Sequence, residues 1–173
     1  MIKKFLLFLL VLILAAVVIF FAPAFLKPKL NYENTVSINK PPAEVWEKMM
    51  ESENMGKWLK GFKSIETLSG EPGTVGSKYK IVIEEDGNRF EAIETVTEVV
   101  EDKRFAFTLD GEVLTNDVVV SLADKGLTTE YTQAETVEGK GFLMRAMFFW
   151  LQSEFSGRSK ESLESFKKFA EEN

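Results

Sequence analysis

The chain opens with its longest hydrophobic run. Residues 5–26 contain no charged or strongly polar side chain, and Lys3 and Lys4 precede them. As a helix rising about 1.5 Å per residue, this run is about 33 Å long, close to the roughly 30 Å hydrocarbon core of a bilayer. The pattern predicts one N-terminal membrane-spanning helix, so the membrane is an expected partner through residues 5–26.

A cleaved signal peptide is the alternative. Ala22-Pro23-Ala24 fits a small-x-small cleavage pattern. The apolar run is longer than the usual signal-peptide core of roughly 7–15 residues, which favours an uncleaved anchor. Both readings send the chain to or through a membrane. Two lysines and the amino terminus precede the run, against Lys27 and Lys29 after it, which slightly favours a cytoplasmic N-terminus and an extracytoplasmic domain.

Beyond the run, a strand is followed directly by short helices. Residues 31–39 alternate between polar and apolar positions, as a strand does. Pro41 and Pro42 end that strand and suit the first turn of a helix. The apolar face of this helix is formed by Val45, Trp46, Met49 and Met50. A second short helix is expected over residues 53–59.

The rest of the chain predicts a sheet and a C-terminal helix. After Gly61, alternating segments and turns such as Asp86-Gly87-Asn88 predict six more strands. Residues 141–172 predict one long helix, whose second half carries an apolar stripe of Leu163, Phe166, Phe169 and Ala170. Antiparallel strands with segregated helices predict an α+β domain over residues 31–173, with residues 1–30 as anchor and linker.

Composition excludes several kinds of site. The 173 residues include no Cys and no His, which rules out a Ser-His-Asp triad, a Cys-His pair and a thiolate nucleophile. A zinc site would need carboxylates alone, which is uncommon, so no metal and no cofactor are expected. Four of the 21 basic residues and none of the 27 acidic ones lie in residues 1–30, leaving a net charge of −10 beyond them. Such a domain repels phosphate backbones, so nucleic acid is not an expected partner.

Acidic side chains are the remaining candidates for acid–base chemistry, namely Glu84, Glu85, Asp86, Glu91, Glu94 and Glu98. Two carboxyls can share such chemistry where burial separates their pKa values. Most of these residues fall in a turn or where an alternating strand faces solvent. Glu94 differs, because Phe90, Ala92 and Val96 share its face. No catalytic residue is predicted from this pattern.

Several segments together resemble a known superfamily. They are INKPPAEVWEKM, IETLSGEPGTVGSKYKI, VTEVVEDKRFAF and LESFKKFAEE, with Trp58 between the first two. In order and spacing, residues 36–172 resemble the polyketide cyclase/START-like (SRPBCC) superfamily, and the chain is similar to its bacterial members with one N-terminal membrane helix. The resemblance implies a helix-grip fold, a seven-stranded antiparallel sheet around a long C-terminal helix. It also implies a cavity for lipids, sterols, polyketides or other apolar molecules. Enzymatic members often place histidine there, which this chain lacks.

Alternation and the resemblance together select the expected cavity wall. The strands and short helices are expected to supply Trp58, Tyr79, Phe90, Phe105, Phe107, Val118, Val120 and Tyr131. The long helix is expected to supply Met144, Phe148, Leu151 and Phe155. A mainly apolar wall with a few polar tips suits an apolar small molecule or lipid. The alternative is an ordinary filled core.

The start of the long helix has more apolar surface than one stripe uses. In FLMRAMFFWL, four residues lie off the stripe: Phe142, Leu143, Phe149 and Trp150. They predict an outer patch that touches the bilayer or a protein partner. The alternative is that these turns pack beneath the two short helices or a loop.

Three functional hypotheses follow. The first is a membrane-anchored module that binds a hydrophobic small molecule or lipid. The second is an enzyme of polyketide cyclase type acting on an apolar substrate, which the absence of His and Cys disfavours. The third is a ligand-free interaction domain for a membrane protein. A cavity favours the first two, and a filled core with an outer apolar patch favours the third.

Overall fold

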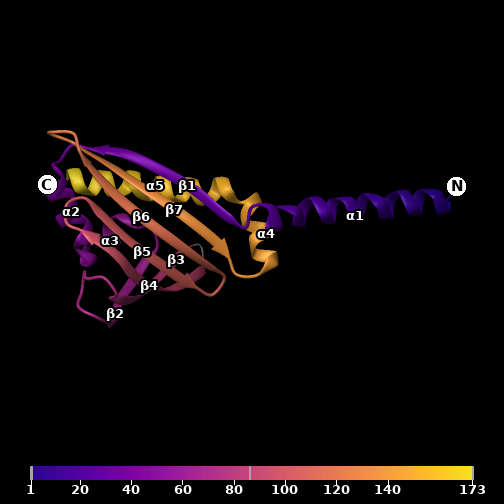
Figure 1. Cartoon of the computed structure of the whole chain (residues 1–173), viewed down its shortest axis with the longest axis horizontal. Helices are drawn as coiled ribbons and strands as arrows, with labels where there is room; N and C mark the ends of the chain where they lie inside the picture. The colour runs from indigo at the N-terminus through magenta and orange to yellow at the C-terminus, as the bar shows by residue number, and fades with distance from the viewer. Residues whose placement is uncertain (1, 86, 173) are drawn as a thin grey trace.

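The computed structural model describes residues 2–85 and 87–172 (Figure 1). The helices are α1 (Ile2–Leu26), α2 (Pro42–Met50), α3 (Met55–Trp58), α4 (Phe142–Trp150) and α5 (Gln152–Glu171), with a 3-10 turn η1 (Ser52–Asn54). The strands are β1 (Lys29–Ile38), β2 (Phe62–Ser69), β3 (Lys78–Glu85), β4 (Asn88–Val100), β5 (Arg104–Gly111), β6 (Leu114–Asp124) and β7 (Thr129–Gly139). The predicted α+β class and the order of its elements are confirmed.

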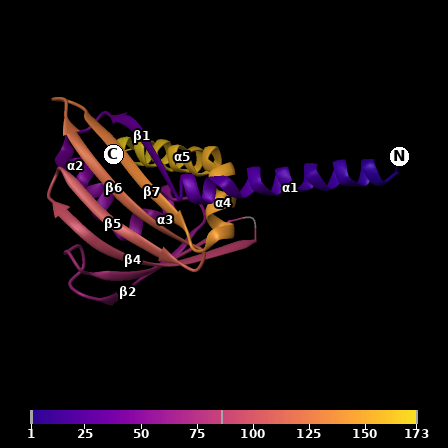
Figure 2. The ribbon, with the colours of Figure 1, turned by 45° about the vertical axis from the view of Figure 1, so that its right-hand side comes forward.

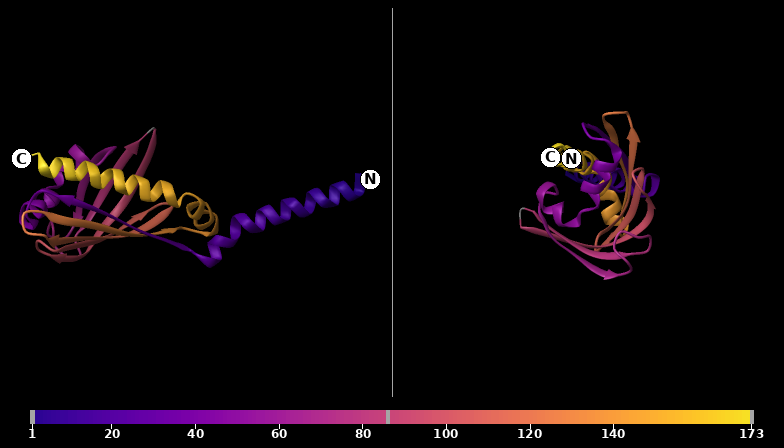
Figure 3. Two further views of the ribbon diagram at one scale, coloured as in Figure 1. Left: turned by 90° about the horizontal axis from the view of Figure 1, so that it is seen from above. Right: turned by 90° about the vertical axis from the view of Figure 1, so that its left-hand side faces the viewer.

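The strands form one antiparallel, seven-stranded sheet in the order β1-β7-β6-β5-β4-β3-β2. Consecutive strands pair from β2 to β7, and β1 pairs with β7 along its whole length. A register shift between Val96 and Glu98 interrupts the pairing of β4 with β5, and such bulges bend a strand and increase its twist. The sheet curves around α5, so that one face is concave (Figures 2 and 3).

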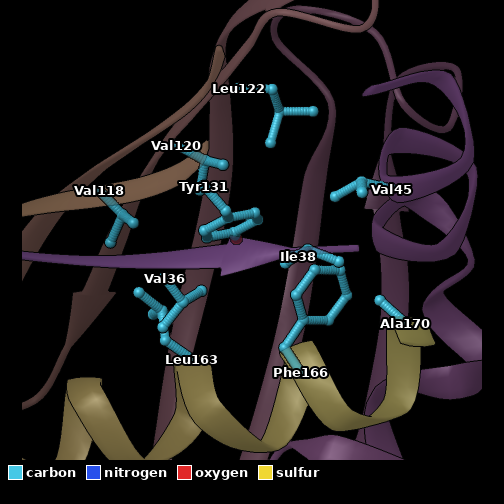
Figure 4. Packing of buried hydrophobic residues seen from close by; sticks show 10 residues of the cluster. All are labelled: Val36, Ile38, Val45, Val118, Val120, Leu122, Tyr131, Leu163, Phe166 and Ala170. Atoms are coloured by element: carbon cyan, nitrogen blue, oxygen red, sulfur yellow. The ribbon is translucent and has the colours of Figure 1, made fainter. Parts of the chain in front are cut away.

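The main core joins α5 to the concave face and to α2. Its buried members are Val36, Ile38, Val45, Val118, Val120, Leu122, Tyr131, Leu163, Phe166 and Ala170 (Figure 4). The predicted stripe of α5 supplies three of them, at the three- and four-residue spacing that places side chains on one helix face. Figure 4 shows these three side chains pointing from α5 toward β1 and the sheet beyond it. This packing holds α5 along one side of the concave face.

The predicted helix over residues 141–172 is interrupted. Leu151, with φ −99° and ψ 12°, separates α4 from α5. α5 runs along the sheet, whereas α4 lies at the end of β7 and in contact with β1 (Figure 1). At Gly139 the backbones are so close that a Cβ atom would lie 2.6 Å from the carbonyl carbon of Met144. Because α4 packs on that end of the sheet, its direction differs from that of α5. The predicted short helix over residues 53–59 is likewise divided, into η1 and α3.

α1 projects away from the domain (Figures 1 and 3). Its length and apolar composition fit a membrane span, and a signal sequence has the same properties. Its C-terminal turns contact α4: the Phe21 ring stacks on Phe142 at a centroid distance of 5.0 Å. The indole N–H of Trp150 donates a hydrogen bond to the Phe20 carbonyl at 3.2 Å. α4 therefore lies beside the point where α1 leaves the domain.

Candidate ligand cavity

A cavity with two adjoining lobes lies between the concave face, α5 and the α2–α3 segment. The outer lobe, of about 470 Å³, reaches from Met49 and Met50 of α2 to Tyr131 of β7. The inner lobe, of about 320 Å³, reaches to Phe155 and Ser159 of α5. Five residues line both lobes and mark their junction: Met55, Trp58, Glu94, Phe107 and Gln133. The two lobes therefore adjoin at these five residues.

The eight residues predicted from the strands and short helices all line this cavity: Trp58, Tyr79, Phe90, Phe105, Phe107, Val118, Val120 and Tyr131. The antiparallel register explains why they meet. Phe107 pairs with Val118 on one side and with Val96 on the other, so side chains of one parity line up across neighbouring strands. The Phe105 and Phe107 rings lie 5.6 Å apart between centroids. The wall is thus mainly apolar and aromatic.

The residues predicted from the long helix are placed differently. Phe155 lines the inner lobe. Met144 and Phe148 instead pack with Leu30 and Val137 in a second core cluster. Leu151 lies at the break between α4 and α5 and is 42% exposed. The predicted stripe assumed one continuous helix, and the break removes α4 from the face that α5 presents to the cavity.

The four residues of the predicted outer patch lie on α4. Phe142, Leu143 and Trp150 are exposed, Trp150 by 51%, and Phe149 is half-buried. Phe142 also contacts Phe25 of α1, with ring centroids 4.6 Å apart. These turns therefore pack against α1 and the end of the sheet.

A buried carboxyl in the inner lobe is held by three donors. Glu135 is 8% exposed. Its Oε2 accepts hydrogen bonds from the Tyr32 hydroxyl at 3.0 Å and from Asn116 Nδ2 at 2.7 Å, and its Oε1 accepts one from Gln133 Nε2 at 2.8 Å. Burial, and secondarily Glu135, raise the pKa of Tyr32 and of Tyr131 above the usual range. Both hydroxyls therefore remain protonated at neutral pH.

Glu94 is the second buried acid, and it lies at the junction of the lobes. It is 8% exposed, and it forms no hydrogen bond or ion pair within residues 2–85 and 87–172. Burial raises its pKa from 4.5 to about 7, because the charged form loses its hydration without compensation. Its carboxyl therefore changes between neutral and charged forms near physiological pH.

Three further polar atoms near the cavity are buried without a hydrogen-bond partner among the described residues. They are Nε1 of Trp58, Oδ1 of Asn116 and Oγ of Ser159. Trp58 lines both lobes, and the other two residues line the inner lobe. Most buried polar groups in proteins are paired, so these three atoms, which lie behind the cavity wall with almost no accessible surface, are a cost to the stability of the fold.

A surface cleft of about 490 Å³ adjoins the inner lobe between α3, β3 and α5. Cleft and lobe share Trp58, Leu59, Ile83, Arg158 and Ser162. An ion pair spans the cleft, with Arg158 Nη1 lying 3.0 Å from Glu85 Oε2 and Lys60 bound to the same carboxylate. These contacts lower the pKa of Glu85, chiefly through the Lys60 hydrogen bond. The cleft therefore borders the inner lobe on the side of Arg158.

The remaining acidic candidates lie outside the cavity. Glu91 and Glu98 are ion-paired with Lys80 and Arg104, at 2.8 and 2.7 Å, and Glu84 is exposed. Asp86 lies outside the described residues. Within the part of the chain that the structure describes, no group of three or more acidic side chains is arranged to hold a metal ion.

Sequence reasoning missed the polar residues around Glu135. A signal for them was present, because Gln133 and Glu135 follow Tyr131 at intervals of two along β7. Tyr32 likewise shares a face of β1 with the buried Val36. Alternation placed these residues on the face that lines the cavity. They were not selected because the expected wall was apolar and these side chains are polar.

The domain resembles solved structures over most of its length. Ara h 8.0201 has a TM-score of 0.69 and 17% identity, over 84% of this chain and 99% of its own. The aromatase/cyclase Zhui from Streptomyces sp. R1128 has a TM-score of 0.69 and 12% identity, over 83% and 94%. A conserved protein from Geobacillus kaustophilus has a TM-score of 0.70 and 20% identity, over 82% and 95%. At these identities the likeness shows the fold.

No curated protein matches the sequence. A family model does, and its match extends from residue 29 to residue 171, which includes every strand and α5. The fold, the cavity and this match agree. The chain therefore belongs to the family described as polyketide cyclase/dehydrase and lipid transport.

Proposed function

We propose that this chain is a membrane-tethered module that binds an apolar small molecule or lipid in the two-lobed cavity. The cavity itself carries the proposal. Its two lobes, of about 470 and 320 Å³, match the size of ligand pockets in other proteins, and their walls are mostly aromatic and aliphatic. A cavity of this kind favours ligand binding over a ligand-free interaction domain. Native mass spectrometry of the purified full-length protein, followed by identification of any released molecule, tests this directly.

A second candidate is an enzyme acting on an apolar substrate, and Glu94 is the observation that favours it. A carboxyl with a pKa of about 7 is suited to general acid–base work at neutral pH. The same mass spectra separate the two functions. Recovery of the bound molecule unchanged after prolonged incubation supports binding, and its conversion to a product of different mass supports catalysis.

The cavity assignment predicts that a charge in its wall prevents binding. In a domain beginning at Lys29, Phe107→Asp is expected to abolish saturable binding of the neutral dye Nile red, because an unpaired charge beside both lobes is costly. Fluorescence titration measures this. Ser121→Asp is the matched control, since it adds the same charge beside Arg104 on the outer face. Normal binding by Phe107→Asp would place the dye outside the cavity.

The tether is proposed to be α1, with the outer patch of α4 at the membrane surface. Full-length protein is expected to remain in the membrane pellet after high-salt and alkaline washing, because a long apolar helix holds it there. The domain beginning at Lys29 is expected in the supernatant. Recovery of a native chain that starts at Phe25 would instead identify residues 1–24 as a cleaved signal.

The patch is tested separately, by co-sedimentation with lipid vesicles. Trp and other aromatic side chains favour the bilayer interface, and Trp150 lies beside the last turns of α1. Phe149→Ser with Trp150→Ser, in the domain beginning at Lys29, is expected to leave the fold intact and weaken co-sedimentation with neutral vesicles. Failure of this double variant to fold would assign both rings to the core.

A further inference from the structure

Glu94 is placed to contact the middle of a bound molecule. It lies on β4, opposite Tyr79 of β3 and Leu109 of β5, and it lines both lobes. Apolar wall extends away from it in two directions, toward Val120 in the outer lobe and toward Val137 in the inner lobe. A ligand that fills both lobes therefore brings an internal atom, rather than a terminal head group, to the Glu94 carboxyl.

The charges of the cavity disfavour an anion at this position. Among the described residues, the charged side chains that line the two lobes are Glu94, Glu135 and Arg158. Arg158 lies where the inner lobe borders the surface cleft and already pairs with Glu85. The other titratable groups on the wall are tyrosines: Tyr32, Tyr79 and Tyr131. A carboxylate or phosphate at the junction would face Glu94, with Glu135 further inside the inner lobe, and the one cation among the described lining residues, Arg158, is already paired.

Hydrogen bonding at the junction favours a neutral polar group instead. A protonated Glu94 carboxyl donates one hydrogen bond and accepts others. Because this carboxyl has no partner among the described residues, a ligand oxygen that accepts its hydrogen bond gains affinity. A carbonyl oxygen can accept this hydrogen bond, and a hydroxyl can both accept from Glu94 and donate to it.

We propose that the cavity selects an uncharged molecule whose apolar body carries a carbonyl or hydroxyl group near its middle, and that Glu94 binds this group. The proposal rests on the proposed function, because it names the ligand class of the same cavity. It adds a specificity-determining role for an acidic residue in a largely apolar wall.

Three probes with one skeleton test it: fluorene, 9-fluorenone and 9-fluorenol, which carry CH₂, C=O and CHOH at the central position. Full-length protein in nonionic detergent micelles is mixed with all three at pH 6, and native mass spectrometry measures each bound probe. The wild type is expected to bind the two oxygenated probes in preference to fluorene. In Glu94→Leu the ratio of each bound oxygenated probe to bound fluorene is expected to fall about tenfold, which corresponds to the free energy of one hydrogen bond. Both proteins experience the same free probe concentrations, so partitioning into micelles cancels.

A second comparison does not depend on whether Glu94→Leu folds. Raising the pH from 6 to 8.5 ionises Glu94 and removes its donor, so wild-type binding of 9-fluorenone is expected to fall by about tenfold. Glu94→Gln keeps a neutral donor, and its binding is expected to stay constant. Tyr32 and Tyr131 remain protonated throughout this range.

The outcomes separate the inference from the proposed function. If the probes bind but neither Glu94→Leu nor pH changes their ratios, the ligand class is wrong and the cavity assignment stands. If no probe binds to the wild type, the proposed function and the inference both fail. Loss of the preference in Glu94→Leu, or a pH effect that Glu94→Gln abolishes, supports the inference.

Discussion

At pH 8, Glu94→Gln is expected to stabilise the domain by roughly 3 kcal/mol. Burial raises the pKa of Glu94 from 4.5 to about 7, so the folded state binds a proton more tightly than the unfolded state does. Between pH 4.5 and about pH 7 the folded state binds more protons than the unfolded state. The free energy of unfolding therefore falls as the pH rises, by about 1.4 kcal/mol for each pH unit in this range. Above about pH 7 the free energy of unfolding falls no further because of Glu94, and it stays lower by this full amount. Glutamine has nearly the same shape and never ionises, so it removes the loss.

The measurement is urea denaturation of the domain beginning at Lys29, for wild type and variant, from pH 4 to pH 8. The difference in unfolding free energy is expected to be near zero at pH 4 and to grow until about pH 7. Glu91→Gln is the matched control on the same strand. Its ion pairs lower the pKa of Glu91, chiefly through the Lys80 hydrogen bond, so removing its charge lowers stability at pH 8. Parallel pH profiles for wild type and Glu94→Gln would show that Glu94 is hydrated in the folded state.

A destabilising acid at the centre of a cavity is consistent with a role in binding. Stability alone would favour Gln, or an apolar residue, at position 94. Functional sites commonly hold groups whose pKa values are displaced by burial. The contrast with Glu135 supports this interpretation, because three donors satisfy Glu135 within the described structure whereas Glu94 has none. The structure thus compensates one buried acid and leaves the other without a partner among the described residues.

The strand face of the cavity was predictable because alternation has a period of two and the antiparallel register carries it across the sheet. Phe105, Phe107, Val118 and Val120 follow from this rule once the family resemblance indicates that the sheet encloses a cavity. The polar residues around Glu135 were harder to predict. Glu135 and Asn116 lie on the cavity face of the sheet, but the hydrogen-bonded group draws its members from β1, β6 and β7. Only the three-dimensional pairing of distant strands brings these residues together.

The helical part was predictable only where packing follows one helix face. Of the predicted stripe in α5, Leu163, Phe166 and Ala170 are buried, and Phe169 is half-buried. The stripe could not be extended through Leu151, because periodicity does not show where a helix changes direction to meet another element. The close approach of α4 to Gly139 and its contact with α1 decide that point. Both are tertiary contacts between segments distant in sequence.

Phe166→Ala is expected to destabilise the domain by about 3–5 kcal/mol, the range measured for removing a buried phenyl ring. The Phe166 ring is 2% exposed, and its centroid lies 5.1 Å from that of Trp58 and 5.2 Å from that of Tyr131. Since both of these rings line the cavity, Phe166 supports the wall from behind, and its loss is also expected to weaken Nile red binding.

Denaturant titration of the domain beginning at Lys29 measures the first effect, with Phe169→Ala as the matched control. Phe169 lies three residues further along the same helix and is only half-buried, with Lys48 and Lys57 each 5.6 Å from its ring. Removing this ring leaves a smaller void and exposes less apolar surface, so the expected loss is about half as large. The wall-supporting role predicts reduced dye affinity for Phe166→Ala alone, under conditions where both variants are fully folded. Equal losses of stability and equal dye affinities in the two variants would contradict this role. They would show that α5 contributes a general apolar surface, and that α3 and the sheet hold Trp58 in position without the Phe166 ring.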